Sequence, residues 1–330
     1  MKEREYTFDV LRVIAMIMVI IIHVSNVYTR SYNFIDTNSY LVSLIFNTIS
    51  RVSVPIFFMI SGALLLDRNF DFKKYKKRIL KIILLIVVWD ILYLIWEYYF
   101  LGVSYNKLYK LFLEPYRAHL WFLYTIVILY VIQPLLKYIL DRTNKTIKIV
   151  LFFAWIILST ISMYNLTIAN IFTIFSNIGF FVLGKYMYDY LLNNKRNNKK
   201  YVFIMIVLLL VSLGESIYLN YTASLKFNMF YNLFFAYRTP FIILSTFIIF
   251  KLVYIYCHNK KPKDIILLGS NLSLGVYLIH GMFLDVTTKY VDYKNVIPII
   301  GIPSFTLYIL VLSMISVYLL RKIKYLNKII

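Results

Sequence analysis

Long apolar runs recur along the whole chain and constrain its fold more than any other feature. Each run contains roughly 18 to 25 residues, the length that an α-helix needs to cross about 30 Å of hydrocarbon. Together they bring the hydrophobic share of the 330 residues to 61%. A soluble core is a weaker explanation of these runs, and strict polar–apolar alternation is too scarce for a β-barrel. The sequence therefore predicts an all-α integral membrane protein.

About ten transmembrane helices are expected. They are predicted at residues 10–30, 40–66, 79–101, 119–140, 148–164, 168–190, 201–219, 232–256, 265–286 and 297–320. An even number of crossings puts both termini on one side of the membrane. The stretches on that side carry about 23 Lys and Arg residues against about 7 on the other, so the positive-inside rule predicts cytoplasmic termini.

The remaining composition excludes several classes of protein. A net charge of +21 would suit nucleic-acid binding, but the basic residues fall between apolar runs and not on one surface with stacking aromatics. A single cysteine, Cys257, excludes an intrachain disulfide and a thiolate metal cluster. The first nine residues lack the features of a removable signal peptide. No polar stretch exceeds about 20 residues, so residues 1–330 are expected to form one transmembrane domain without an appended soluble domain.

The first predicted helix carries three residues that are costly in lipid: Asp9, Arg12 and His23. Ten residues lie between Arg12 and His23, and the eleven helical steps correspond to about 16 Å along the helix and a rotation back to within roughly 20° of the same face. One stripe therefore presents a cation near the cytoplasmic surface and an imidazole beyond the bilayer midplane. Packing alone does not explain such a pair.

Most other intramembrane ionisable residues fall in the outer half of the predicted helices. They are Arg51, Glu97, His119, Glu215, Arg238 and His280. Their clustering predicts a polar chamber open to the outside, approached from the cytoplasm by Arg12 and the basic segment 67–81. Simpler explanations remain open: an Arg51–Glu97 ion pair joining two helices, snorkelling of Glu215 and Arg238, and an interfacial position for His119.

Five collinear motifs make the sequence resemble the acyltransferase 3 family of bacterial membrane acyltransferases. They are FDVLRVIAMIMVIIIHVS (8–25, with the Arg12–His23 spacing), VPIFFMISGALLL (54–66), the basic segment leading to Arg78, HLWFLYTIVILYVIQPLL (119–136) and LGSNLSLGVYLIHGMF (268–283). The resemblance covers nearly the whole chain. It implies a multi-pass enzyme of the bacterial plasma membrane that moves an acyl group from cytoplasmic acyl-CoA, usually acetyl-CoA, to a hydroxyl of a surface or lipid-linked carbohydrate, without a metal.

The motifs and the geometry together assign roles to named residues. His23 is expected to act as general base or transient acyl carrier, and His280 is a second candidate base that the sequence does not rank. The donor side is assigned to Asp9, Arg12, Ser61, Gly62, Lys77 and Arg78. Here Arg12 holds an anionic part of the donor, Asp9 orients its guanidinium, and Gly62 permits close approach of the donor chain. The acceptor side is assigned to Arg51, Glu97, His119, Trp121, Glu215 and Arg238.

A transporter or exporter of a surface polysaccharide or amphiphile is the main alternative, because a polar chamber with charged walls also suits translocation. The stripe on the first helix argues against it. A transporter has no need for a cation and an imidazole that share one face of a helix but lie at opposite depths in the membrane.

Overall fold

The computed structural model describes residues 4–67, 70–102, 114–163, 169–193, 198–324 and 327, in which all regular structure is helical and none is strand. Its α-helices are α1 (Tyr6–Thr29), α2 (Thr37–Ser50), α3 (Ser53–Leu65), α4 (Phe72–Trp96), α5 (Trp121–Arg142), α6 (Lys145–Ile161), α7 (Ala169–Asn193), α8 (Lys199–Phe227), α9 (Pro240–Cys257), α10 (Asp264–Tyr290) and α11 (Pro298–Lys322). Residues 68 and 69 of the predicted basic segment, and the predicted span ends at 164 and 168, lie outside this description.

Eight helical segments among the described residues are long and apolar enough to cross a membrane. The segment formed by α2 and α3 counts as one of them, whereas α6, with 17 residues, is shorter than the others. The predicted all-α fold is confirmed. The count of ten crossings and the side on which the termini lie stay predictions.

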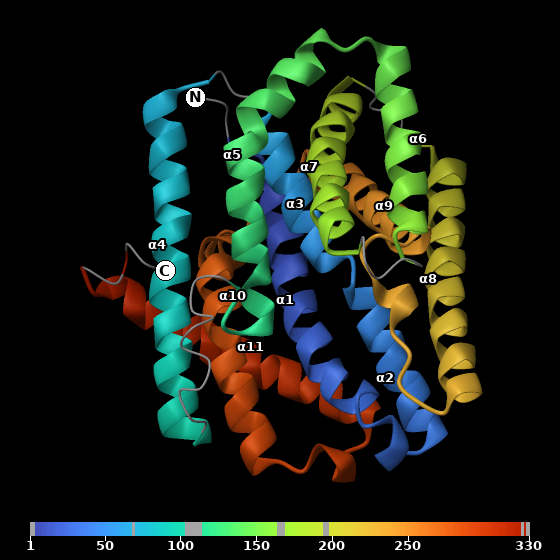
Figure 1. The fold of residues 1–330 in the computed structure, drawn as a ribbon, viewed down its shortest axis with the longest axis vertical. Coiled ribbons are helices and arrows are strands. Elements are labelled where there is room, and N and C mark those ends of the chain that lie inside the picture. The colour runs from blue at the N-terminus through green and yellow to red at the C-terminus, as the bar shows by residue number, and fades with distance from the viewer. Residues whose placement is uncertain are drawn as a thin grey trace.

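Helix α1 runs through the middle of the molecule (Figure 1) and contacts α2, α3, α9, α10 and α11. Helix α4 lies at one flank and α8 at the other. Both flanking helices expose aliphatic side chains outward, such as Leu84 on α4 and Leu210 on α8. A helix that is apolar on its outer face as well as its inner face is typical of a lipid-facing position. The polar stripe of α1 is therefore enclosed by other helices.

The predicted helix at 40–66 is broken into α2 and α3 at residues 51 and 52. Pro55 has no N–H group, so the carbonyl of Arg51 has no partner one turn later and the helical ladder is interrupted. The backbone N–H of Arg51 instead closes a shorter turn onto the carbonyl of Thr48 at 3.1 Å. The break places Arg51 at a junction between two helices, facing α1.

Helices α3 and α7 pack so closely that their backbones touch at two glycines. A Cβ atom on Gly62 would lie 1.6 Å from the carbonyl oxygen of Phe181, and one on Gly184 would lie 1.9 Å from the carbonyl oxygen of Met59. Only glycine fits at these positions. The space next to Gly62, which was predicted to receive the donor chain, is thus filled by the backbone of α7.

Candidate active site

Three histidines from distant parts of the chain form one cluster. His23 lies on α1, His280 on α10, and His119 on the short 3-10 turn before α5. The ring centroid of His280 is 5.1 Å from that of His23 and 5.0 Å from that of His119, and His23 and His119 are 6.0 Å apart. The structure therefore places His23 and His280, the two proposed bases, next to His119, which was predicted to lie on the acceptor side.

Hydrogen bonds define which nitrogen of His280 can act as a base. Its Nδ1 lies 2.6 Å from the carbonyl oxygen of Tyr277 and 3.2 Å from that of Val276. Because carbonyl oxygens only accept, Nδ1 carries the proton, and in the neutral ring Nε2 holds the lone pair. His280 is 1% exposed, and its Nε2 has no hydrogen-bond partner among the described residues. An unsatisfied buried nitrogen next to His23 is available for proton transfer.

Contacts with α10 also position His119. Its ring hydrogen-bonds the backbone of Leu278, and the Tyr277 hydroxyl donates to the His119 carbonyl. Its Nε2 is buried without a partner in the described structure. A Cβ on Gly281 would lie 2.9 Å from the His119 ring, so this glycine lets the ring reach α10. The α10 backbone thus positions both His119 and His280.

A cavity of about 400 Å³ opens beside the cluster, and we call it the histidine cavity. Its polar and aromatic lining comprises His23, Asn26, Arg30, Arg51, His119, Trp121, Phe122, Tyr237 and Tyr277. Trp121 and Tyr237 stack on one wall with ring centroids 5.9 Å apart. His23 faces this space with no hydrogen bond to any described residue, so both of its ring nitrogens are free to meet a substrate.

The structure does not contain the Arg51–Glu97 ion pair that the sequence left open as a simpler explanation. Glu97 accepts a hydrogen bond of 2.6 Å from Arg117, which also pairs with Asp285 on α10. Arg51 instead donates from Nε to the Oδ1 of Asn47 at 2.8 Å. Glu97 therefore belongs to a separate ion cluster on the α4 side of His119, whereas Arg51 lines the histidine cavity.

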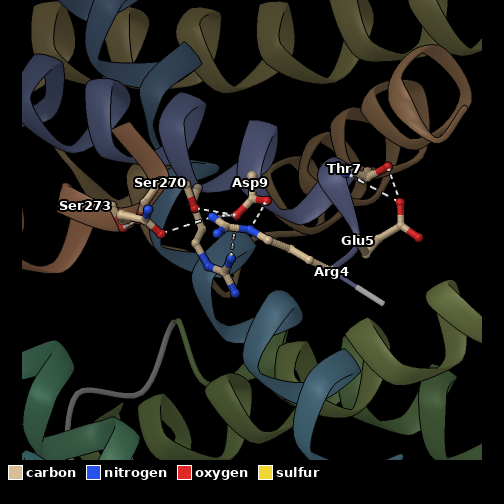
Figure 2. A network of polar contacts seen from close by, with 8 residues as sticks. Arg4, Glu5, Thr7, Asp9, Ser270 and Ser273 are labelled. Carbon is tan, nitrogen blue, oxygen red and sulfur yellow. Dashed lines mark hydrogen bonds and ion pairs between the residues drawn. The ribbon is translucent and has the colours of Figure 1, made fainter. Parts of the chain in front are cut away.

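Arg12 sits at the other end of the same stripe of α1 and contacts Asp9, whose polar network with Arg4 and Ser270 is shown in Figure 2. Asp9 accepts hydrogen bonds from Arg12 Nη1 at 3.1 Å, from Arg4 Nε at 2.7 Å and from Ser270 Oγ at 2.6 Å. Arg4 in turn reaches Asn271 of α10 at 3.0 Å. The hydrogen bond to Asp9 raises the pKa of Arg4, and this outweighs the opposing effect of burial. The expected contact between Asp9 and Arg12 is present, and Asp9 has two further partners.

A second, smaller cavity of about 170 Å³ begins at Arg12, and we call it the arginine cavity. It is also lined by Ser61, whose side chain hydrogen-bonds Tyr130 of α5. Four residues line both this cavity and the histidine cavity: Val19, Val54, Phe122 and Tyr277. One face of α1 carries Arg12, Val19 and His23, because Val19 follows Arg12 by seven positions and His23 follows Val19 by four. The two cavities are therefore neighbours along the predicted stripe, separated by a wall of mostly apolar side chains.

The remaining donor-side residues lie near the arginine cavity. Lys77 and Arg78 are in the second turn of α4, whose Ile82 lines the cavity. Arg78 is close enough to Tyr130 for an electrostatic interaction, as is Arg12. Lys77 is exposed. The basic start of α4 thus adjoins the end of the molecule where Arg12 lies.

Besides Glu97, two residues assigned to the acceptor side do not line the histidine cavity. Glu215 is exposed on α8. Arg238 lines a separate cavity of about 200 Å³ with Ser176 and Asn177. Sequence reasoning did not single out Arg117, Asp285, Tyr93, Tyr277, Asn26 or Tyr237. Of these, Tyr277 lies three residues before His280 in the motif 268–283, and Asp285 lies five residues after His280, just beyond that motif, so closeness to His280 in the sequence was the available signal.

Comparison with known proteins identifies the family. The model of the acyltransferase 3 family, described as an acyltransferase domain, matches residues 5–320. No curated protein and no solved structure matches the chain. The match includes α1 with its Arg12–His23 stripe and α10 with His280. The chain therefore belongs to the acyltransferase 3 family of membrane proteins, whose members transfer acyl groups to carbohydrates.

Proposed function

We propose that this acyltransferase moves an acetyl group from cytoplasmic acetyl-CoA to a hydroxyl group of a cell-surface or lipid-linked glycan in the bacterial plasma membrane. One observation carries the proposal: along one stripe of α1, a cavity lined by the cation Arg12 adjoins a cavity lined by His23 and His119, two of the three clustered histidines. Such an arrangement would let a thioester and an alcohol that enter from opposite sides of the membrane meet. The family assignment and the histidine cluster favour transfer over transport.

The arginine cavity fits the donor. Arg12 presents a permanent charge and several N–H donors, which suit a phosphate or the polar amides of a pantetheine chain. The basic start of α4, including Lys77 and Arg78, supplies further positive charge for the nucleotide phosphates. The small volume of about 170 Å³ and the mainly apolar lining suit the slender chain that carries the acyl group.

The histidine cavity fits the acceptor and the reaction. His23 takes the proton of the acceptor hydroxyl as its oxygen attacks the thioester carbonyl. The carbon–sulfur bond then breaks, and the proton returns from His23 to the leaving thiolate. His280 and His119 lie against His23 with buried, unpaired Nε2 atoms. They hold its ring and stabilise the positive charge that it gains.

Substitution of His23 tests the assignment. We expect His23→Ala to abolish transfer of label from acetyl-CoA to the glycan while the protein still inserts and unfolds at the same temperature. His258 is the matched control, because it lies at the end of α9 with Glu5 and is the only histidine outside the cluster. His258→Ala should retain wild-type activity. Wild-type activity of His23→Ala would refute the role of this residue.

Substitution of Arg12 tests the donor site separately. Arg12→Gln should raise the KM for acetyl-CoA at least about tenfold, corresponding to about 1.4 kcal/mol, with a smaller effect on kcat. Arg142→Gln, at an exposed position at the end of α5, provides the control for loss of a positive charge. Unchanged acetyl-CoA binding in Arg12→Gln would remove this residue from the donor site. Comparison of glycan composition between wild-type and deletion cells would identify the acyl group and acceptor together.

A further inference from the structure

Arg51 differs from the other arginines near the active site because all its described partners are neutral. Its Nε donates to Asn47 at 2.8 Å, its guanidinium carbon lies 5.0 Å from the centre of the Phe235 ring, and it shares the cavity lining with Tyr237. A weak contact of 3.5 Å reaches Asn26. These groups satisfy hydrogen bonds but leave the charge uncompensated.

Several other cations of the described helices have carboxylate partners. Arg12 pairs with Asp9, Arg117 with Glu97 and Asp285, and Lys185 with Asp67 and Asp189. Lys251 also lacks a carboxylate among the described residues, but its amine is surrounded by the rings of Tyr190, Tyr201 and Phe247. Arg51 alone among these lines the histidine cavity. A charge in a protein interior requires a counter-charge, and the cavity is where a ligand would supply it.

The lining of the histidine cavity is positive as a whole. Arg30 lies at its exposed edge, and neither Asp nor Glu is among the residues that line it. Asn47 also donates from Nδ2 to Asn26 and to Ser25, both at 2.9 Å, and so forms a network that orients Arg51 from behind. The guanidinium is therefore positioned before a ligand arrives, which lowers the entropic cost of binding.

From these contacts we infer that the acceptor carries an anionic group, a carboxylate or a phosphate, that binds Arg51 while the hydroxyl to be acylated faces His23. This inference rests on the proposed function and names the substrate class that the same site accepts. A planar guanidinium binds either anion through two parallel N–H bonds. The anion can belong to the sugar itself or to the phosphate that links a glycan to its lipid.

The dimensions of the cavity agree with a charged sugar. About 400 Å³ accommodates a monosaccharide unit with its substituent. The stacked rings of Trp121 and Tyr237 offer an apolar wall for one face of the sugar. Arg51 and His23 line the same cavity, so a single residue of the acceptor can contact both.

Binding experiments test the inference without relying on catalysis. Purified protein in phosphatidylcholine nanodiscs would be heated with glucose, glucuronate or glucose 1-phosphate, and the midpoint of unfolding recorded against ligand concentration. Glucuronate or glucose 1-phosphate should raise the midpoint, and glucose should not. Arg51→Gln should weaken anion binding at least about tenfold. Arg51→Lys should lose less affinity for the anions, because lysine keeps the positive charge but lacks the two parallel N–H donors of the guanidinium.

Lys226→Gln is the matched control, because Lys226 is an exposed cation at the end of α8 and does not line the cavity. It should bind the anions like the wild type. Equal stabilisation by glucose and by both anions, or unchanged anion binding in Arg51→Gln, would overturn the inference. Stabilisation only when phosphatidylglycerol replaces phosphatidylcholine would assign Arg51 to a lipid headgroup and also overturn it.

A kinetic arm separates this inference from the proposed function. With labelled acetyl-CoA, anionic sugars should be acetylated faster than glucose by the wild type, and Arg51→Gln should lose that preference. Lys226→Gln should keep that preference and should hydrolyse acetyl-CoA without an acceptor at the wild-type rate. If the wild type does not cleave acetyl-CoA but anions still stabilise it and not Arg51→Gln, the proposed donor is wrong and the anion site stands.

Discussion

The imidazole of His280 lies 5.1 Å from that of His23, ring centre to ring centre, and its Nδ1 is held by the carbonyl of Tyr277. This arrangement predicts that the two histidines act as a unit. His280→Ala should reduce kcat by a factor similar to His23→Ala, and the double variant should be hardly slower than either single one, because residues that act together are not additive. Multiplicative losses in the double variant would show independent roles.

Phe122 lies in the wall between the two cavities and is predicted to limit the size of the acyl group. Phe122→Ala should join the cavities and raise kcat/KM for butyryl-CoA relative to acetyl-CoA at least about tenfold, because the removed ring frees space along the path. Phe153→Ala is the control, since Phe153 is 58% exposed on α6. An unchanged ratio of the two donors would place the acyl group elsewhere.

The ion cluster of Arg117, Glu97 and Asp285 is predicted to stabilise the turn that carries His119. Arg117→Gln leaves two largely buried carboxylates without their cation and should lower the free energy of unfolding by about 3–5 kcal/mol. Chemical denaturation in detergent measures this change. The exposed pair of Lys74 and Asp71 is the comparison, and Lys74→Gln should alter stability by less than about 1 kcal/mol.

Gly62 is predicted to be essential for packing between α3 and α7. Gly62→Ala forces a methyl group against the Phe181 backbone and should cost about 3 kcal/mol, the upper part of the usual range for overpacking, because backbone yields less than a side chain. Gly214→Ala is the matched control: nothing lies within 4 Å of its added Cβ, and alanine favours a helix by up to about 1 kcal/mol. Equal stability of the two variants would contradict the packing.

Cys257 allows a direct test of the predicted orientation. It is the only cysteine of the chain, is partly exposed, and ends α9 next to His258, which contacts Glu5 before α1. A membrane-impermeant maleimide should label it in inverted vesicles and not in intact cells, because the positive-inside rule places this end in the cytoplasm. Cys257→Ser gives the background. Labelling only in intact cells would reverse the proposed sides of donor and acceptor.

Much of the helical framework follows from local sequence. Apolar runs of membrane length predict helices wherever the structure describes them, since a chain in lipid must satisfy its backbone hydrogen bonds within each segment. The phase of Arg12 and His23 follows from helical geometry alone and matches their places in adjoining cavities. Pro55 also accounts for the break before α3. Because it lies within a long apolar run, the sequence predicted one continuous helix there.

Pairings between distant residues were decided only by the tertiary structure. The sequence left an Arg51–Glu97 ion pair open, but the fold brings Arg117 to Glu97 and leaves Arg51 facing the histidine cavity. Likewise, the sequence places Glu215 near one end of a helix without showing that it faces outward. Depth along the membrane can be counted in residues, whereas the neighbours of a side chain depend on how each helix is rotated and packed against the others. Local sequence thus determined the helices and the Arg12–His23 stripe, and packing alone assembled the three histidines and selected their charged neighbours.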